Sequence, residues 1–463
     1  MKAASADDLI LWDVFEEHLE EAAFLLSMWR SRLLADNYTF DELRTGPEQR
    51  LRLHVDALVI GGPRIAERLL HPALMEGEPE QATVAALAML DGARKKKDAL
   101  QTLIAIMEAT DPARSEALGA ALVLCEQGLL PELLLAEVKR PRAPEVRARL
   151  LDALAEHGRD AGPALSDALQ DETPALQRAG LAAVAASGRR DAIFECEQLL
   201  RSPDGMTRNL AFDAALTLSS PEAWAQCLSR SRRPEAEDGH CLLLRSLLGG
   251  AGDHAWLLRL FEAGEALPAV LWAMGFGGQA AYVEPLLTAL DHEESRVAKL
   301  AAEAFCAITG FDPYDESDVT QQPSVGSSVQ AKAGDETEAD EAEEEGQGDD
   351  FAFEDEDLDA DLVPDAVEQL PSLERAQAEA WWKQKRGDFD RESRYIAGER
   401  LELSSVVAAL GSGPARRRHA WALGIAIASG SAYRVSTRAF CSRQQPQMDA
   451  LAKAKPGELG RLL

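Results

Sequence analysis

Histidine and cysteine, the side chains that most often ligate metals or act as nucleophiles, are scattered along this 463-residue chain. Zinc sites need such ligands at short, regular spacings, and the sequence contains neither His-Glu-x-x-His nor Cys-x-x-Cys. His240 and Cys241 are adjacent, but a metal site or an activated thiol would need further partners that the sequence does not place nearby. We therefore expect no metal ligands, and we expect the six cysteines to be reduced core residues.

Glycines and carboxylates give no stronger indication of catalysis. Gly275, Gly277 and Gly278 form a short glycine-rich run, but no Lys-Ser or Lys-Thr follows to complete a phosphate-binding loop. The chain also lacks the Gly-x-Ser-x-Gly pattern of a serine nucleophile. Its 79 acidic residues make pairs of carboxylates uninformative as an acid–base signal. The sequence therefore predicts a protein that is not an enzyme and that binds no cofactor.

Two clusters of basic residues stand out in an acidic chain. Residues 94–97 read Arg-Lys-Lys-Lys, and residues 416–418 are three arginines. Either cluster could receive an acidic segment of this chain or of a partner protein. The simpler interpretation assigns the first cluster to a solvated loop and the second to the start of a helix.

Acidic residues are concentrated in one segment. The net charge is −31, and residues 312–365 hold 21 acidic residues against one lysine, so this segment alone carries 1 − 21 = −20. Such a composition cannot bury enough apolar surface to offset chain entropy, and we expect disorder there. Phe351 and Phe353 stand among these acids and could fold onto a basic partner, although a solvated linker is the simpler interpretation.

Charge and hydropathy also bear on partners and location. Nucleic-acid binding needs a basic footprint, so a chain this acidic is a poor candidate for it. Residues 1–8 lack an apolar leader, and no run approaches 18 consecutive apolar residues. We therefore expect a cytoplasmic protein with no membrane contact, and the sequence leaves its oligomeric state open.

The elements that would have to position any site are helices in a regular repeat. Ala and Leu dominate while aromatic residues make up only 6% of the chain, a balance that suits close helix packing. Proline is tolerated in the first turn of a helix, so prolines spaced 32, 33, 32 and 30 residues apart predict regular helix starts. These prolines are Pro47, Pro79, Pro112, Pro144 and Pro174.

The clearest unit follows Pro144. Val146, Leu150, Ala153 and Leu154 form an apolar stripe at helical spacing, and a His-Gly pair at 157–158 closes the helix. A second helix is predicted over about 162–169, and the same first-helix pattern recurs over 295–310. Helix pairs with a period near 31 residues predict a solenoid, in which each unit buries its apolar face against its neighbours.

We predict an all-α fold, a right-handed HEAT-like α-solenoid with an N-terminal helical cap and a long acidic disordered insertion before the last repeat. The predicted parts are the cap over 1–46, the HEAT-like repeats over 47–311, the acidic insert over 312–365 and the C-terminal helices over 366–463. The final repeat is predicted after the three arginines at 416–418, where Ala and Leu resume the first-helix pattern.

Two sets of residues resemble known families. Residues 144–154 and 295–305 resemble the short HEAT-like repeat of phycobilin lyase subunits. Residues 18–25 (HLEEAAFL), 304–310 (AFCAITG), 381–382 (WW) and 394–398 (RYIAG) resemble a poorly characterised bacterial family of HEAT-repeat proteins, often associated with type VI secretion gene clusters. This second resemblance spans nearly the whole chain and implies an accessory or adaptor role. The acidic insert is longer than the family leads us to expect.

These features favour a protein–protein interaction scaffold or adaptor. The resemblance implies an accessory factor of type VI secretion that loads an effector or a spike or tip protein. The second helices of the repeats are expected to line the inner, partner-binding surface of the solenoid. Aromatic side chains often dominate interfaces, although each of these is more commonly a core residue. The candidate protein-binding residues are Trp224, Trp256, Phe261, Tyr282, Phe351, Phe353, Trp381 and Trp382.

Two other functions stay open. The repeat resemblance also fits a phycobilin-lyase-like enzyme, although no nucleophile or acid stands out. The acidic insert also fits a chaperone for a basic client protein, whose binding would be lost at high salt.

Overall fold

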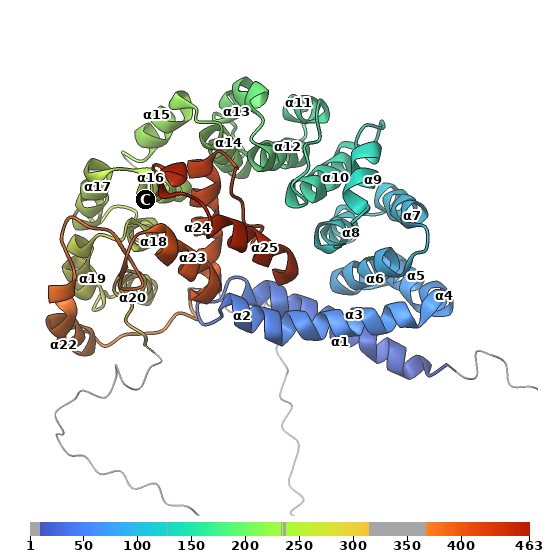
Figure 1. The fold of residues 1–463 in the computed structure, drawn as a ribbon, viewed down its shortest axis with the longest axis horizontal. Helices are drawn as coiled ribbons and strands as arrows, with labels where there is room; N and C mark the ends of the chain where they lie inside the picture. The colour runs from blue at the N-terminus through green and yellow to red at the C-terminus, as the bar shows by residue number, and fades with distance from the viewer. Residues whose placement is uncertain (1–9, 127, 233, 235–237, 314–366) are drawn as a thin grey trace, which may run out of the picture.

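The computed structural model describes residues 10–126, 128–232, 234, 238–313 and 367–463. Within these residues nearly all regular structure is helical, and helix pairs stack side by side along a curved path (Figure 1). The prediction of an all-α, solenoid-like fold is confirmed. Most of the predicted acidic insert, together with Phe351 and Phe353, lies outside the described residues.

The first helices of the repeats form the inner row of the curve (Figure 1). Most of them pack directly on the next helix of the row. The row consists of α6 (Pro79–Gly92), α8 (Pro112–Leu124), α10 (Pro144–Glu156), α12 (Pro174–Ser187), α14 (Gly205–Thr217), α16 (Gly239–Leu248), α18 (Leu267–Gly277) and α20 (Ser295–Thr309).

The second helices form the outer row (Figure 1). They are mostly shorter than the inner helices. They are α7 (Lys96–Ala109), α9 (Leu130–Glu137), α11 (Ala164–Leu169), α13 (Ile193–Leu199), α15 (Pro221–Arg230), α17 (Ala251–Glu262) and α19 (Val283–Ala289), with 3-10 turns η4 (Arg190–Ala192) and η6 (Ala280–Tyr282) leading into α13 and α19.

The spaced prolines mark helix starts with one exception. Those in the first turn of an inner helix are Pro79, Pro112, Pro144 and Pro174. Pro47 instead lies inside a π-helical turn, η2 (Arg44–Glu48), so the prediction of a helix start there is wrong. In a π-helical turn the backbone hydrogen bonds do not follow the i−4 pattern of an α-helix. The missing N–H of proline is therefore tolerated there.

The predicted apolar stripes are buried. In α10, Val146, Leu150, Ala153 and Leu154 are all shielded from solvent, and Gly158 follows the helix with a φ of +65°. The stripe of α20 is buried in the same way, and Gly310 ends that helix in the left-handed conformation at φ +75°. An apolar stripe indicates the face of a helix that is buried. The stripes therefore identify the inner helices correctly, because burial is strongest in the inner row.

The N-terminal helices cover the first end of the row. α1 packs against α3 and against α6, the first inner helix. The elements here are α1 (Trp12–Arg32), α2 (Phe40–Leu43), α3 (Gln49–Ile60), α4 (Gly62–Ile65), the π-helical turn η3 (Ala66–Leu70) and α5 (His71–Glu76).

The C-terminal elements mix helices with one short hairpin. In the hairpin, β1 pairs antiparallel with β2, with Tyr395 opposite Arg400. The elements are α22 (Arg375–Lys385), η7 (Arg386–Asp388), β1 (Tyr395–Ile396), β2 (Glu399–Arg400), α23 (Leu403–Ser412), α24 (Ala415–Ser429), α25 (Cys441–Leu451) and the 3-10 turn η8 (Pro456–Leu459).

Helix α24 does not extend the row of repeats as the sequence pattern suggests. It folds back inside the curve and packs against α12, α14 and α16 (Figure 1). Its buried side chains occur around the whole helix rather than on one stripe, which is the pattern of a central helix. Trp421 and Ile425 of α24 join the larger of two hydrophobic clusters, which extends back to α1.

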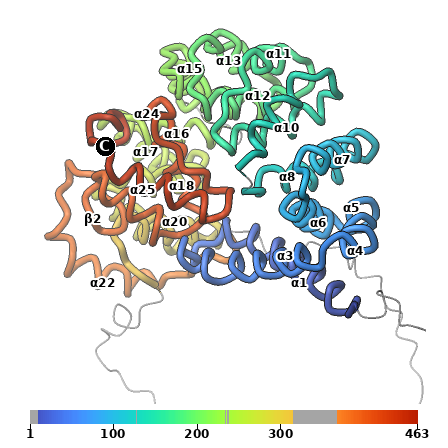
Figure 2. The backbone as a smooth tube through the Cα atoms, turned by 45° about the vertical axis from the view of Figure 1, so that its right-hand side comes forward, coloured from blue at the N-terminus to red at the C-terminus, as the bar shows by residue number. Residues whose placement is uncertain are grey.

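The C-terminal half also meets the N-terminal half and closes the curve into a ring. The backbone N–H of Ala415 donates to the carbonyl of Tyr38 at 2.7 Å, and that of Arg416 donates to Ala35 at 3.1 Å. These are N-terminal amides of α24, which lack partners inside their own helix. The loop after α1 therefore caps α24, as the neighbouring blue and red segments in Figures 1 and 2 show.

Candidate binding surfaces

Part of the inner face of the solenoid is covered by the chain itself. The expectation that second helices line this face is wrong, because the first helices do so and the second helices lie outside (Figure 1). The inner helices carry the wider apolar faces, and the C-terminal segment (residues 394–463) packs onto them. Covering that face buries apolar surface that a free concave surface would expose to water.

Arginines of the C-terminal segment bind the ends of successive inner helices. Arg443 donates to the carbonyls of Val123 and Cys125 at the end of α8, at 2.8 and 2.9 Å. Arg434 donates to Ala155 of α10 at 2.6 Å. The last carbonyls of a helix lack partners within it, so these guanidinium groups satisfy them.

Arg394 makes the equivalent contact farther along the row. Its guanidinium donates to the carbonyls of Phe276 and Gly277 in α18 at 3.1 and 3.0 Å, and to Leu462 at 2.9 Å. Burial lowers the pKa of Arg394 to about 10, which still leaves it charged at neutral pH. The RYIAG stretch of the sequence is thus a structural clamp between the inner row and the end of the chain.

The basic cluster at 416–418 is buried rather than available to an acidic segment. Glu303 of α20 pairs with Arg416 at 3.2 Å and with Arg417 at 3.5 Å. Arg418 donates to the side chain of Gln444 at 2.7 Å and to the carbonyl of Leu410 at 2.6 Å. The docking role considered for this cluster is therefore wrong, because its charges are already paired inside the ring.

The other basic cluster lies at the turn between α6 and α7. Lys96 donates to the carbonyls of Leu90 and Asp91 at 2.6 and 2.8 Å, and so caps the end of α6. Lys95 lies 3.9 Å from the carboxylate of Asp98. Of this cluster, Lys96 serves the local helix end rather than a separate surface.

Two of the predicted aromatic residues are core residues. Tyr282 is buried, and its hydroxyl donates to the carbonyl of His254 at 2.8 Å. Trp382 is also buried, and its indole nitrogen donates to Glu284 at 3.0 Å. Neither ring is offered to a partner protein.

The other described candidates are partly exposed and lie apart from one another. Trp224 packs on the larger hydrophobic cluster beneath Arg461. Trp256 donates to the carbonyl of Ser231 at 3.2 Å, while Phe261 packs on the smaller cluster. Trp381 stacks edge-on against Phe305 and Phe311. The structure does not bring these rings together into one surface.

The neighbouring residues His240 and Cys241 have structural roles. Nε2 of His240 lies 2.6 Å from the carboxylate of Asp213, and this ion pair outweighs burial and raises the pKa of the imidazole. The carbonyl of Cys241 accepts a hydrogen bond from the thiol of Cys227 at 3.4 Å. Among the described residues, no three potential ligands are grouped so that they could hold a metal ion.

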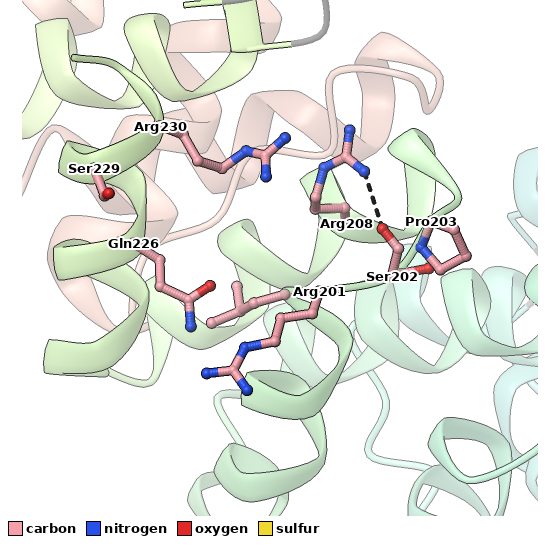
Figure 3. A pocket seen from close by; sticks show the side chains of 8 residues that line it. Arg201, Ser202, Pro203, Arg208, Gln226, Ser229 and Arg230 are labelled. Atoms are coloured by element: carbon pink, nitrogen blue, oxygen red, sulfur yellow. Dashed lines mark hydrogen bonds between the residues drawn. The ribbon is translucent and has the colours of Figure 1, made fainter. Parts of the chain in front are cut away.

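A groove lined by arginines lies where α15 faces the loop between α13 and α14. We call it the α13–α15 groove; its volume is about 390 Å³. Arg201 and Gln226 point into it, with Arg208 and Arg230 above them (Figure 3). Its lining residues are Leu200, Arg201, Ser202, Pro203, Arg208, Gln226, Ser229 and Arg230.

The three guanidinium groups differ in how firmly they are held. Arg208 is only 6% exposed and donates to the carbonyl of Ser202 at 2.9 Å. Arg230 donates to the buried carboxylate of Asp238 at 2.7 Å. The side chain of Arg201 is 80% exposed and touches Glu222 only at 4.0 Å. The groove thus presents two hydrogen-bonded guanidinium groups and one that is largely exposed to solvent.

The sequence alone gives little indication of this groove. Arg201 and Arg230 are 29 residues apart, and the stacking of two repeats brings them to the same side. The closest signal in the sequence is the alternation of Ser and Arg from Ser229 to Arg232.

No described helix is both long enough and apolar enough to span a bilayer. Comparisons with known proteins add little. No family model and no curated protein matches the chain. Among solved structures, the X-ray structure of the Escherichia coli protein YibA aligns with 66% of this chain and 98% of its own length, at 13% identity and a TM-score of 0.31. A similarity this weak carries no inference about the fold or activity of this chain.

Proposed function

We propose that this protein is a non-enzymatic scaffold or adaptor that binds an acidic segment of a partner protein in the α13–α15 groove. The observation that carries the proposal is the convergence of Arg201, Arg208 and Arg230 in one groove of a chain whose net charge is −31. Most of this protein repels acidic partners, so a local cluster of guanidinium groups selects where such a partner can bind.

The groove suits carboxylates because of how its donors are arranged. Guanidinium groups bind carboxylates through paired, charge-assisted hydrogen bonds. The side chains of Gln226 and Ser229 add neutral donors beside Arg201. Each exposed ion pair is worth only about 0.2–1 kcal/mol, so binding needs several contacts at once and weakens as salt is added.

The biological setting is the second part of the proposal. The resemblance of residues 18–25, 304–310 and 394–398 to a secretion-associated family supports an accessory role in type VI secretion, with an effector or a spike or tip protein as the partner. Such a role would place the protein in the cytoplasm. The clamping contacts of Arg394 show that at least one of these similar stretches serves the fold itself.

Capture of partners from the native host tests the proposal. Full-length protein is used as bait at about 150 mM salt, and bound proteins are identified by mass spectrometry. The baits are the wild type, Arg201→Glu, Gln226→Glu and the matched charge reversal Arg391→Glu, which lies outside the groove on an exposed loop.

We expect an effector, spike or tip protein with the wild type and with Arg391→Glu, and its loss with both groove variants. Equal recovery by all four baits would reject the groove as the binding site. A basic client that is lost only when residues 315–362 are deleted would instead support the chaperone function.

A further inference from the structure

A second cavity lies inside the ring, where three distant parts of the chain meet. We call it the central cavity; its volume is about 400 Å³. α1 and the turn after it form one wall, α8 and α10 form the next, and α24 with the loop after it closes the third. A volume of this size is within the range of small-molecule sites, which start at about 300 Å³.

One part of the lining is apolar. Trp29, Leu33 and Leu34 contribute from the N-terminal side, and Ala120 and Val123 face them from α8. Leu34 is 52% exposed even though it is a large aliphatic side chain. Exposed apolar side chains around a concave space favour a ligand with a hydrocarbon body, because its binding would remove them from water.

The polar lining contains donors that have no acceptor. Trp29 is only 2% exposed, and its indole N–H is buried without a hydrogen-bond partner. Nε of Arg149 is also buried and unpaired. Neither nitrogen is accessible to solvent, so a ligand in the cavity could reach these donors only after the lining side chains move.

The charges in the cavity leave one arginine uncompensated. Arg30 pairs with Glu80 at 3.0 Å, and Arg149 lies 3.3 Å from Glu116 and 3.8 Å from Asp152. Arg438 lines the same cavity and makes no hydrogen bond or ion pair with any described residue. The positive charge that lacks a carboxylate partner therefore lies on the C-terminal wall, where it is exposed to solvent.

We propose that the central cavity binds a small amphipathic carboxylate, whose anionic group pairs with Arg438 and whose hydrocarbon body lies against Leu34 and Val123. The apolar wall and the arginine that lacks an ion-pair partner are complementary to the two ends of such a molecule. Because the walls come from the N-terminal, middle and C-terminal parts of the chain, the bound ligand stabilises the closed ring by mass action. This site is independent of the α13–α15 groove.

Titration calorimetry with octanoate tests the site on the full-length protein. We expect saturable binding of one octanoate per chain, and we expect Arg438→Gln to weaken it about two- to fivefold, the effect expected for an ion pair with an exposed arginine. Arg438 is exposed and makes no contacts that the fold needs, so the variant should fold normally. Arg391→Gln removes an exposed arginine outside the cavity and should bind octanoate like the wild type.

Two further arms separate a specific site from general hydrophobic binding. Octan-1-ol, which has the same hydrocarbon chain without the charge, should bind the wild type about two- to fivefold more weakly than octanoate does. It should bind Arg438→Gln as tightly as it binds the wild type. Ala120→Phe, which fills the cavity from α8, should abolish octanoate binding while the thermal midpoint confirms folding. No octanoate binding, or equal binding by the wild type and Arg438→Gln, would overturn the proposal.

Discussion

At the scale of single residues, stability depends on a few charges buried at the centre of the ring. Glu303 lies between Arg416 and Arg417, and the guanidinium of Arg417 stacks over Phe276 at 4.0 Å. Burial raises the pKa of Glu303, whereas the two arginines act in the opposite direction. Such a group is tolerated only because its partners are fixed around it.

Neutralising this carboxylate should therefore be costly. Glu303→Gln leaves Arg416 and Arg417 buried without their counter-charge, and we expect a loss of about 3–5 kcal/mol in the free energy of unfolding. Urea denaturation measures the loss, with the exposed Glu399→Gln as the control. A loss no larger than that of the control would show that Glu303 is not the counter-ion of this cluster.

A half-buried histidine, His419, links α24 to the N-terminal half and should make the ring acid-sensitive. Nε2 of His419 donates to the carbonyl of Leu33 at 3.2 Å, and Nδ1 lies 2.7 Å from the hydroxyl of Thr437. Burial, together with nearby Arg438 and Arg418, lowers the pKa of His419 to about 4. The neutral ring is therefore the folded form.

The folded pKa lies below the unfolded value of about 6.5, so acid favours the unfolded chain. The stability that His419 supports is complete above about pH 6.5 and falls by about 3 kcal/mol as the pH drops towards 4. His419→Gln should remove this part of the acid dependence, measured as the free energy of unfolding at pH 7 and pH 4.5. His71→Gln, at an exposed position, should leave the pH dependence intact; identical profiles for both variants would contradict the assignment.

At the scale of elements, local sequence patterns predict the repeated helices but not the packing of the C-terminal segment that closes them into a ring. Four of the five spaced prolines and the stripe from Val146 to Leu154 identify helices correctly, because helix starts and apolar faces depend on neighbouring residues. The place of α24 could not be predicted this way, since its sequence resembles a first helix and only distant packing puts it inside the ring. The groove residues were missed for the same reason: the stacking of repeats, rather than sequence spacing, brings them together.

Glycine allows the C-terminal segment to approach the inner helices. Gly278 ends α18 at φ +66°, and an added Cβ would lie 2.3 Å from the carbonyl oxygen of Tyr395. Gly264 has a similar φ of +70°, but its surroundings are open. The two positions share the backbone conformation and differ only in the contact with the segment.

This pair separates backbone strain from the contact itself. Gly264→Ala should cost about 1 kcal/mol in the free energy of unfolding, the usual penalty for alanine at a positive φ. Gly278→Ala should cost about 3 kcal/mol, because the strand at Tyr395 must also move. Thermal or urea unfolding of the two variants gives the comparison, and equal costs would show that the segment does not press on α18.

At the scale of the whole molecule, the chain is a solenoid whose inner face is partly occupied by its own C-terminal segment. This segment binds the ends of the inner helices through Arg394, Arg434 and Arg443, and the loop after α1 caps α24. We therefore expect a partner to meet the outer row and the loops between helices rather than a free concave surface. The proposed site in the α13–α15 groove follows from that arrangement and from the charge of its lining.

Photo-crosslinking of the full-length protein in its native host tests this central claim most directly. A photoreactive amino acid is placed either at Ser229 in the groove or at Ala432, which is exposed on the loop after α24 inside the ring. We expect one partner protein to be crosslinked from Ser229 and not from Ala432, and we expect Arg201→Glu to prevent this crosslink. A partner crosslinked from Ala432 alone would show that the inner face, and not the groove, is the binding surface.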